Sequence, residues 1–226
     1  MLKISSNFIG NFKIGDNINY NLRVVALLYK YFNQASEHEK HLLCKPIILI
    51  LISIIEAVLH DFHTRIRTFT LEGVTSLARD VISYVRGKSI DELGKYIASA
   101  KKHDFFDTHD TEFYDLLDQL RRLRNRIHIQ NTENNFEPNE HDAFTEKRKI
   151  LAERVLEKIL RTMSEKHSRN IDVSIYVDNF ELPWVGYFPA SNPATETIIC
   201  CPYCAFPAND YDPDVIYQCL NCGDPF

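Results

Sequence analysis

Basic and polar side chains are concentrated near the middle of the chain, where residues 120–130 read LRRLRNRIHIQ. Because an α-helix turns by about 100° per residue, a helix through this stretch would gather four of these side chains within about 60° of one another. The four are Arg121, Arg124, Asn125 and His128. Arg122 would lie about 120° away from the histidine. Guanidinium groups beside an amide and an imidazole could hold a phosphate and transfer a proton.

A structural explanation also exists for the arginines, because positive side chains stabilise the C-terminal end of a helix and can remain solvated there. That explanation does not extend to the neighbouring polar residues. Asparagine is a poor residue for a helix interior, and histidine is uncommon. The grouping of Arg124 with Asn125 and His128 therefore favours a functional role for this stretch.

Two Cys-x-x-Cys pairs lie near the C-terminus, with 14 residues between them. The four residues are Cys201, Cys204, Cys219 and Cys222. Each pair lets two thiolates reach one ion, and together they supply the tetrahedron of sulfur ligands that Zn²⁺ prefers. Four protein ligands leave no open position, so we expect a structural zinc ion. Disulfide bonds are the alternative, which a reducing cytoplasm disfavours.

Apolar periodicity predicts the helix that carries the polar stretch. Its apolar face comprises Phe113, Leu116, Leu117, Leu120, Leu123 and Ile127, at spacings of three and four residues. A second helix over 47–62 is apolar on nearly every side, which is typical of the centre of a bundle. It carries Glu56, and an unpaired buried carboxylate is costly. Glu56 therefore either points to the rim or pairs with a base such as Arg124.

Local signals place further helices. One begins near Asn17, and two capping boxes are predicted, at Ser36–Glu39 and Ser89–Glu92. Pro46 would kink a helix or open the next one. The remaining helices are predicted over 70–86, 89–102 and 142–167, and period-two alternation over 171–177 predicts a strand.

The predicted fold class is mainly α, an up-and-down helical bundle followed by a small β zinc-ribbon module. The bundle is expected over residues 1–168, a strand and proline-rich connector over 169–193, and the zinc ribbon over 194–226. Trp184 in the connector is expected to be buried because its indole ring is large and apolar.

The composition, 45% hydrophobic and 25% charged, is ordinary for a soluble globular protein. The chain begins without the apolar run of a secretory signal, and the run at residues 47–55 is too short to span a bilayer. We therefore expect a cytoplasmic protein without a membrane partner. Five of the 31 acidic residues and none of the 26 basic ones follow residue 190. The tail is thus not expected to bind nucleic acid, because phosphate contacts need cations.

The helical part, about residues 17–168, resembles the HEPN superfamily of helical-bundle domains. The resemblance rests on the apolar stretch LILISIIEA at 49–57 and on LRRLRNRIH at 120–128. In that superfamily an arginine, often followed by asparagine, precedes a histidine with four to six residues between them. Here Arg122 leaves five residues before His128 and Arg121 leaves six, whereas the Arg124–Asn125 dipeptide leaves three. The spacing and the dipeptide therefore indicate different arginines.

The resemblance implies metal-independent RNA cleavage, in which a ribose 2′-hydroxyl attacks the adjacent phosphate. His128 would move the proton, Arg124 or Arg122 would stabilise the charge on phosphorus, and Asn125 would orient the phosphate or the imidazole. Glu56 is included among the candidate catalytic residues as a partner of the arginine. Members of the superfamily commonly dimerise so that two motifs form one cleft, and a homodimer is therefore expected.

Two functional hypotheses follow. The first is a HEPN-like ribonuclease, acting as a toxin or phage-defence effector, with a structural zinc ribbon that docks a partner. The second is a catalytically inactive HEPN-like binding protein whose acidic zinc ribbon recruits a protein. A helical interaction protein with no role in nucleic-acid chemistry is a third reading.

Overall fold

The computed structural model describes the chain except for residues 70–73, 107, 109–110, 129–138, 170–176 and 189–226. All of the described residues lie in the first compact unit, Met1–Phe188. The predicted zinc ribbon and its four cysteines therefore lie outside the described residues. Within the described part the protein is mainly helical, which confirms the predicted fold class at that level.

The described residues form seven helices and a two-stranded antiparallel sheet. In chain order they are β1 (Leu2–Ile4), α1 (Phe12–Phe32), α2 (Glu37–Thr68), α3 (Arg79–Arg86), α4 (Leu93–His103), α5 (Thr111–Asn125), α6 (Glu140–Ala143), α7 (Glu146–Lys166) and β2 (Phe180–Leu182). In the sheet, Lys3 is the register partner of Glu181, and their side chains form an ion pair at 2.7 Å.

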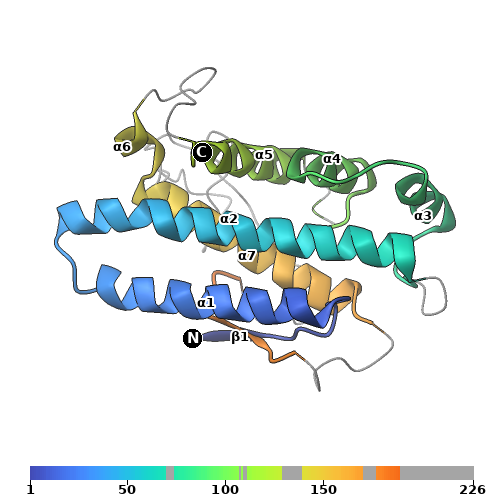
Figure 1. Ribbon diagram of the computed structural model, residues 1–226, viewed down its shortest axis with the longest axis horizontal. Coiled ribbons are helices and arrows are strands. Elements are labelled where there is room, and N and C mark those ends of the chain that lie inside the picture. The colour runs from blue at the N-terminus through green and yellow to red at the C-terminus, as the bar shows by residue number, and fades with distance from the viewer. Residues whose placement is uncertain (70–73, 107, 109–110, 129–138, 170–176, 189–226) are drawn as a thin grey trace, which may run out of the picture. The chain divides into compact units, whose positions relative to one another are not determined.

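Helix α2 is the centre of the bundle and contacts α1, α3, α4, α5 and α7. Figure 1 shows it crossing the middle of the molecule, with α1 on one side, α4 and α5 on the other, and α7 behind it. Several of its side chains are fully enclosed, including Ile47, Ile55 and Leu59. Its role therefore follows from the nearly continuous apolar surface that the sequence predicted.

The start and the continuity of α2 differ in how well they were predicted. The capping box is confirmed, since the Glu39 carboxylate accepts hydrogen bonds from the Ser36 amide and hydroxyl. Of the two effects predicted for Pro46, the opening of a new helix is wrong, because α2 runs through this residue. Proline removes the hydrogen bond to the carbonyl of Leu42. Leu42 is 61% exposed, so water can satisfy that carbonyl instead.

By length and composition alone α2 could cross a membrane, but half of its most apolar window is buried inside the bundle. The core helix of a soluble protein has the same character. The apolar composition of α2 is therefore only weak support for a membrane span. The contacts of α2 with its neighbouring helices agree with a core position.

Buried charges join the N-terminal segment to α2. The Asp61 carboxylate accepts hydrogen bonds from the amides of Gly10 at 2.6 Å and Asn11 at 2.9 Å. The Asn11 side chain in turn caps the start of α1. Burial raises the pKa of Asp61 above its usual value, although these amides and Arg65 oppose the shift. Asp61 thus fixes where α1 begins against the central helix.

Two further buried carboxylates attach residues 184–188 to α7. Glu157 is fully buried and accepts hydrogen bonds from Arg161 Nε at 2.9 Å, Trp184 Nε1 at 3.2 Å and the Tyr187 amide at 3.0 Å. Glu153 accepts from the Tyr187 hydroxyl. Residues 177–188, which the sequence assigned to a connector, therefore pack as part of the first compact unit. Trp184 is 7% exposed, as expected for a buried anchor.

Other boundaries depart from the sequence predictions. Helix α4 begins at Leu93, four residues after Ser89, and the predicted Ser89–Glu92 capping box does not form. Ser89 instead donates to Asp91 at 3.4 Å. The last long helix begins at Glu146, after the short helix α6. The predicted strand at 171–177 lies outside the described residues, apart from Val177.

Candidate functional site

Glu56 and Arg124 form an ion pair between α2 and α5, with 2.5 Å between Oε2 and Nη2. Pairing, rather than a free rim position, is thus the arrangement that Glu56 adopts. The two side chains keep 26% and 39% of their surface exposed. A guanidinium has five N–H donors, so this contact leaves others for a ligand. Glu56 fixes the direction in which they point.

The ion pair lines an open pocket of about 560 Å³. Residues from α1, α2, α4 and α5 contribute, together with the segment that precedes α4. The lining comprises Ile14, Asn17, Ser53, Glu56, Ala57, His60, Asp91, Tyr96 and Arg124. An open pocket with several convergent polar groups is the usual setting of a binding or catalytic site. Its volume is of the order that a nucleotide-sized ligand requires.

His60 and Tyr96 form a second polar pair in the same pocket. His60 Nδ1 lies 2.8 Å from the Tyr96 hydroxyl, and the two rings meet edge to face at 72°. Burial raises the pKa of Tyr96, and the negative charges of Asp91 and Glu56 add to the shift. The phenol therefore stays protonated at neutral pH. It can donate to a neutral imidazole or accept from a protonated one.

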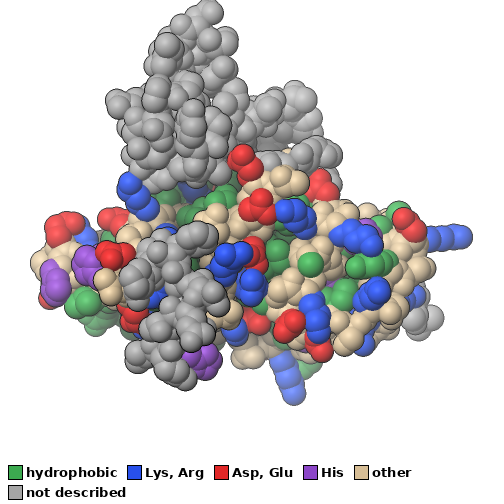
Figure 2. Space-filling model, turned by 90° about the horizontal axis from the view of Figure 1, so that it is seen from above, with side chains coloured by type: hydrophobic (Ala, Val, Ile, Leu, Met, Phe, Trp, Pro, Cys, Tyr) green, Lys and Arg blue, Asp and Glu red, His purple; other side chains and the backbone are tan. Residues whose placement is uncertain are grey.

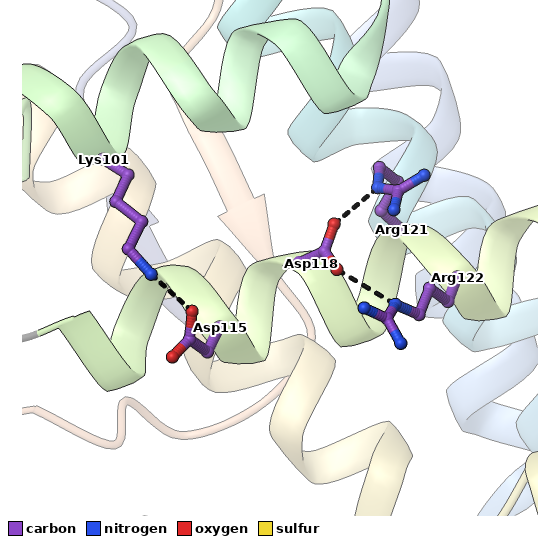
Figure 3. A network of polar contacts seen from close by, with 5 residues as sticks. All are labelled: Lys101, Asp115, Asp118, Arg121 and Arg122. Carbon is purple, nitrogen blue, oxygen red and sulfur yellow. Dashed lines mark hydrogen bonds and ion pairs between the residues drawn. The ribbon is translucent and has the colours of Figure 1, made fainter. Parts of the chain in front are cut away.

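Arg121 and Arg122 are both directed to Asp118, an acid on their own helix, as Figure 3 shows. Arg121 Nε donates to Asp118 at 2.6 Å, and Arg122 Nε donates to the other oxygen at 3.0 Å. Burial opposes ionisation of Asp118, but the two guanidinium groups outweigh it and hold its pKa below the usual value. Both arginines use Nε, which leaves their terminal nitrogens outside this contact.

The helix predicted over residues 120–130 is wrong for residues 126–128, and residues 129–130 lie outside the described part of the chain. Helix α5 ends at that residue, and the amides of Arg126 and Ile127 close the last turn on carbonyls three residues earlier. The angular relation assumed between His128 and the arginines therefore does not apply. His128 is exposed and is not among the residues that line the pocket, and Asn125 is exposed at the end of α5.

The structure thus brings together two of the six predicted catalytic residues, Glu56 and Arg124. It pairs Arg121 and Arg122 with Asp118, and it leaves Asn125 and His128 at the exposed end of α5. His60 and Tyr96 were not predicted as site residues. One signal was available for His60, which follows Glu56 by four residues and so occupies the same face of α2.

Charge on the face of the molecule drawn in Figure 2 is mixed. In Figure 2, Lys and Arg side chains alternate with Asp and Glu over the visible described surface. Several charged side chains of the described residues are paired, for example Lys101 with Asp115 at 2.6 Å and Lys95 with Asp91 at 2.7 Å. Recognition of a polyanion by the described residues would therefore depend on a few positioned donors rather than on a broad basic field.

His41, His63 and His141, elsewhere in the described helices, have structural partners. His63 is buried with Nδ1 2.8 Å from the Leu59 carbonyl, and His41 stacks on His141. Among the described residues, no group of three or more potential ligands could hold a metal ion. The chain matches no known family model, and no curated protein or solved structure is significantly similar to it.

Proposed function

We propose that the protein is a metal-independent RNA endonuclease of the HEPN type, with its site in the pocket between α2, α4 and α5. The observation that carries the proposal is the Glu56–Arg124 ion pair in an open, polar pocket. An arginine whose direction is fixed in advance can stabilise charge that develops on a phosphate without reorganising at the moment of reaction.

The proposed reaction is an internal transesterification of RNA. The 2′-oxygen bonds to phosphorus and the bond from phosphorus to the 5′-oxygen breaks, which gives a cyclic phosphate and a free 5′-hydroxyl. Arg124 would stabilise the charge on the phosphoryl oxygens through its remaining donors. Asn125 and His128 are exposed at the adjacent end of α5, where a large substrate can reach them. The sequence assigns proton transfer to His128.

The proposal includes a cytoplasmic homodimer that acts as a toxin or phage-defence effector. The C-terminal segment would bind one structural Zn²⁺ through Cys201, Cys204, Cys219 and Cys222. Four thiolates match the preference of zinc and leave it no catalytic position. A segment of this length is too short to build a hydrophobic core, so metal binding would supply its folding energy. Its acidic surface would dock a protein partner.

Cleavage of total tRNA by the purified full chain in EDTA tests the proposal, with a zinc-replete sample alongside. The wild-type protein is expected to cleave, and Arg124→Ala is expected to lower the rate by about 10²–10³-fold, the usual cost of one transition-state donor. Arg23→Ala is the matched control, because Arg23 is an exposed arginine on α1 with only a distant partner, Asp178 at 3.9 Å. Equal rates for Arg124→Ala and wild type would refute the assigned site.

A catalytically inactive binding protein is the second candidate, and a specific observation favours it. Arg121 and Arg122, the two arginines with the spacing typical of the superfamily, both pair with Asp118. In that case the pocket serves binding or structure, and the acidic tail recruits the partner. Absence of cleavage by the wild-type protein at every RNA concentration would support this candidate over the nuclease.

A further inference from the structure

The described pocket contains one imidazole, and it belongs to His60. This residue lies on α2 one turn after Glu56, so both side chains occupy the same face of the helix. His60 is exposed, whereas its partner Tyr96 is 3% exposed. A reactive side chain that is open to solvent and held by a buried, rigid partner is the usual arrangement for a group that transfers protons.

We propose that His60 is a catalytic residue that transfers the proton in the pocket, and that Tyr96 is the positioning residue that orients its imidazole. The inference rests on the proposed RNA cleavage and replaces His128 in that role. The hydrogen bond at Nδ1 fixes the ring and turns Nε2 away from Tyr96. Glu56 and Arg124 line the same pocket as His60 and Tyr96.

The assigned step balances without any other reagent. Neutral His60 accepts the proton of the ribose 2′-hydroxyl at Nε2 while the 2′-oxygen bonds to phosphorus. The bond between phosphorus and the 5′-oxygen breaks, and the protonated imidazole returns the proton to the departing oxygen, directly or through one water molecule. Tyr96 serves both states, because its hydroxyl can accept from Nδ1–H throughout the cycle. Arg124 stabilises the phosphoryl charge.

The charged groups around His60 come from α2, α5 and the segment before α4. On α2, Glu56 lies one turn before it, and Asp61 and His63 are close enough to influence or be influenced by its charge. Helix α5 contributes Arg124, and the segment before α4 contributes Asp91. Helix α1 contributes only the uncharged Ile14 and Asn17. The carboxylates of Glu56 and Asp91 and the guanidinium of Arg124 therefore line the same pocket as the His60 imidazole.

The test compares initial rates of cleavage of a short RNA by His60→Ala, His60→Gln and His128→Ala. Glutamine retains a polar group that can bond to Tyr96 but cannot carry a proton, so it separates catalysis from folding. Both His60 variants are expected to lose about 10²–10⁴-fold in kcat with KM nearly unchanged. His38→Ala is the control, since His38 is an exposed histidine in the first turn of α2, outside the pocket.

The outcomes separate this inference from the nuclease proposal. Wild-type activity that survives in both His60 variants overturns the role of His60 and leaves the nuclease standing. Activity that is lost in His128→Ala but intact in His60→Gln also overturns the role of His60 and leaves the nuclease standing. Absence of any wild-type cleavage overturns the nuclease and, with it, the catalytic role of His60.

Nitrogen-15 NMR measures the tautomer ratio of the His60 imidazole, which would not change in Tyr96→Phe if Tyr96 had only a structural role. In the wild-type protein His60 is expected to show one dominant tautomer when neutral, because Tyr96 bonds only Nδ1. Tyr96→Phe is expected to mix the tautomers and to displace the limb of the rate–pH profile that His60 controls. An unchanged tautomer ratio and an unchanged profile in Tyr96→Phe would overturn the positioning role.

Discussion

Replacing the buried His63 with leucine should change how the stability of the protein depends on pH. His63 is 1% exposed, and its ring packs against Phe62, Tyr96 and Phe105. Its Nδ1 bonds to the Leu59 carbonyl, and within the described residues its Nε2 is buried without a partner. Burial therefore lowers the pKa of His63 from 6.5 to about 4. The folded state disfavours the charged imidazole.

The sign of the effect follows from the order of the two pKa values. Above the unfolded value of 6.5 the imidazole is neutral in both states and proton binding contributes nothing. Below it the unfolded chain binds a proton that the folded chain refuses. The free energy of unfolding should therefore fall by about 1.4 kcal/mol at about pH 5.5 and by about 2.6 kcal/mol at about pH 4.5. The loss should level off below the folded pKa.

Urea unfolding of the wild-type protein and His63→Leu at about pH 7, 5.5 and 4.5 measures this difference. Leucine is similar in volume to histidine and cannot bind a proton, so the variant should gain on the wild type by the amounts above as pH falls. The pKa of His167 is lowered as well, chiefly by burial, but this residue is common to both proteins and cancels. Parallel stability–pH curves would refute the reasoning.

Three further predictions concern the fold and the metal. Gly15→Ala should lower the free energy of unfolding by about 1–3 kcal/mol, because the new methyl group would lie 2.6 Å from a methyl of Val177. The control is Gly94→Ala, where the nearest neighbour of the new methyl is 3.6 Å away; this variant should be neutral or stabilising in the same thermal melt. Glu157→Ala should cost about 3–5 kcal/mol in urea unfolding, because it strands buried donors; a change below 1 kcal/mol would contradict the role given to this carboxylate. Elemental analysis of the full chain should find one zinc per chain and should lose it in Cys201→Ser; zinc retained in that variant would contradict the ligand set.

The parts of the fold that were predicted from the sequence are those set by local pattern. The capping box at Ser36–Glu39 and the apolar surface of α2 are readable because hydrogen bonding and periodicity act over a few residues. Pro46 lies inside α2 and does not open a new helix; the sequence left that choice open, because the effect of a proline depends on how the carbonyl that loses its hydrogen bond is satisfied, which only the packing decides. The same limit applies to Ser89, whose side chain turned to Asp91 instead of capping a helix.

The candidate site was predicted in part for a similar reason. Glu56 was singled out because an acid in an apolar helix needs a partner, and Arg124 is that partner. Tyr96 could not be linked to His60 from the sequence, since the two residues belong to different helices and no spacing rule connects them. His128 was placed with the arginines by extending a regular helix past Asn125, where the chain instead closes with tighter turns.

The most direct measurement identifies the ends produced when the wild-type protein acts on a short RNA with one cleavable linkage, in the presence of EDTA. The account predicts a cyclic phosphate on one fragment and a 5′-hydroxyl on the other, with no cut when the 2′-hydroxyl at that linkage is replaced by hydrogen. Arg124→Ala should leave the RNA largely intact under the same conditions. Cleavage of the 2′-deoxy linkage, or full activity in Arg124→Ala, would contradict the assigned chemistry.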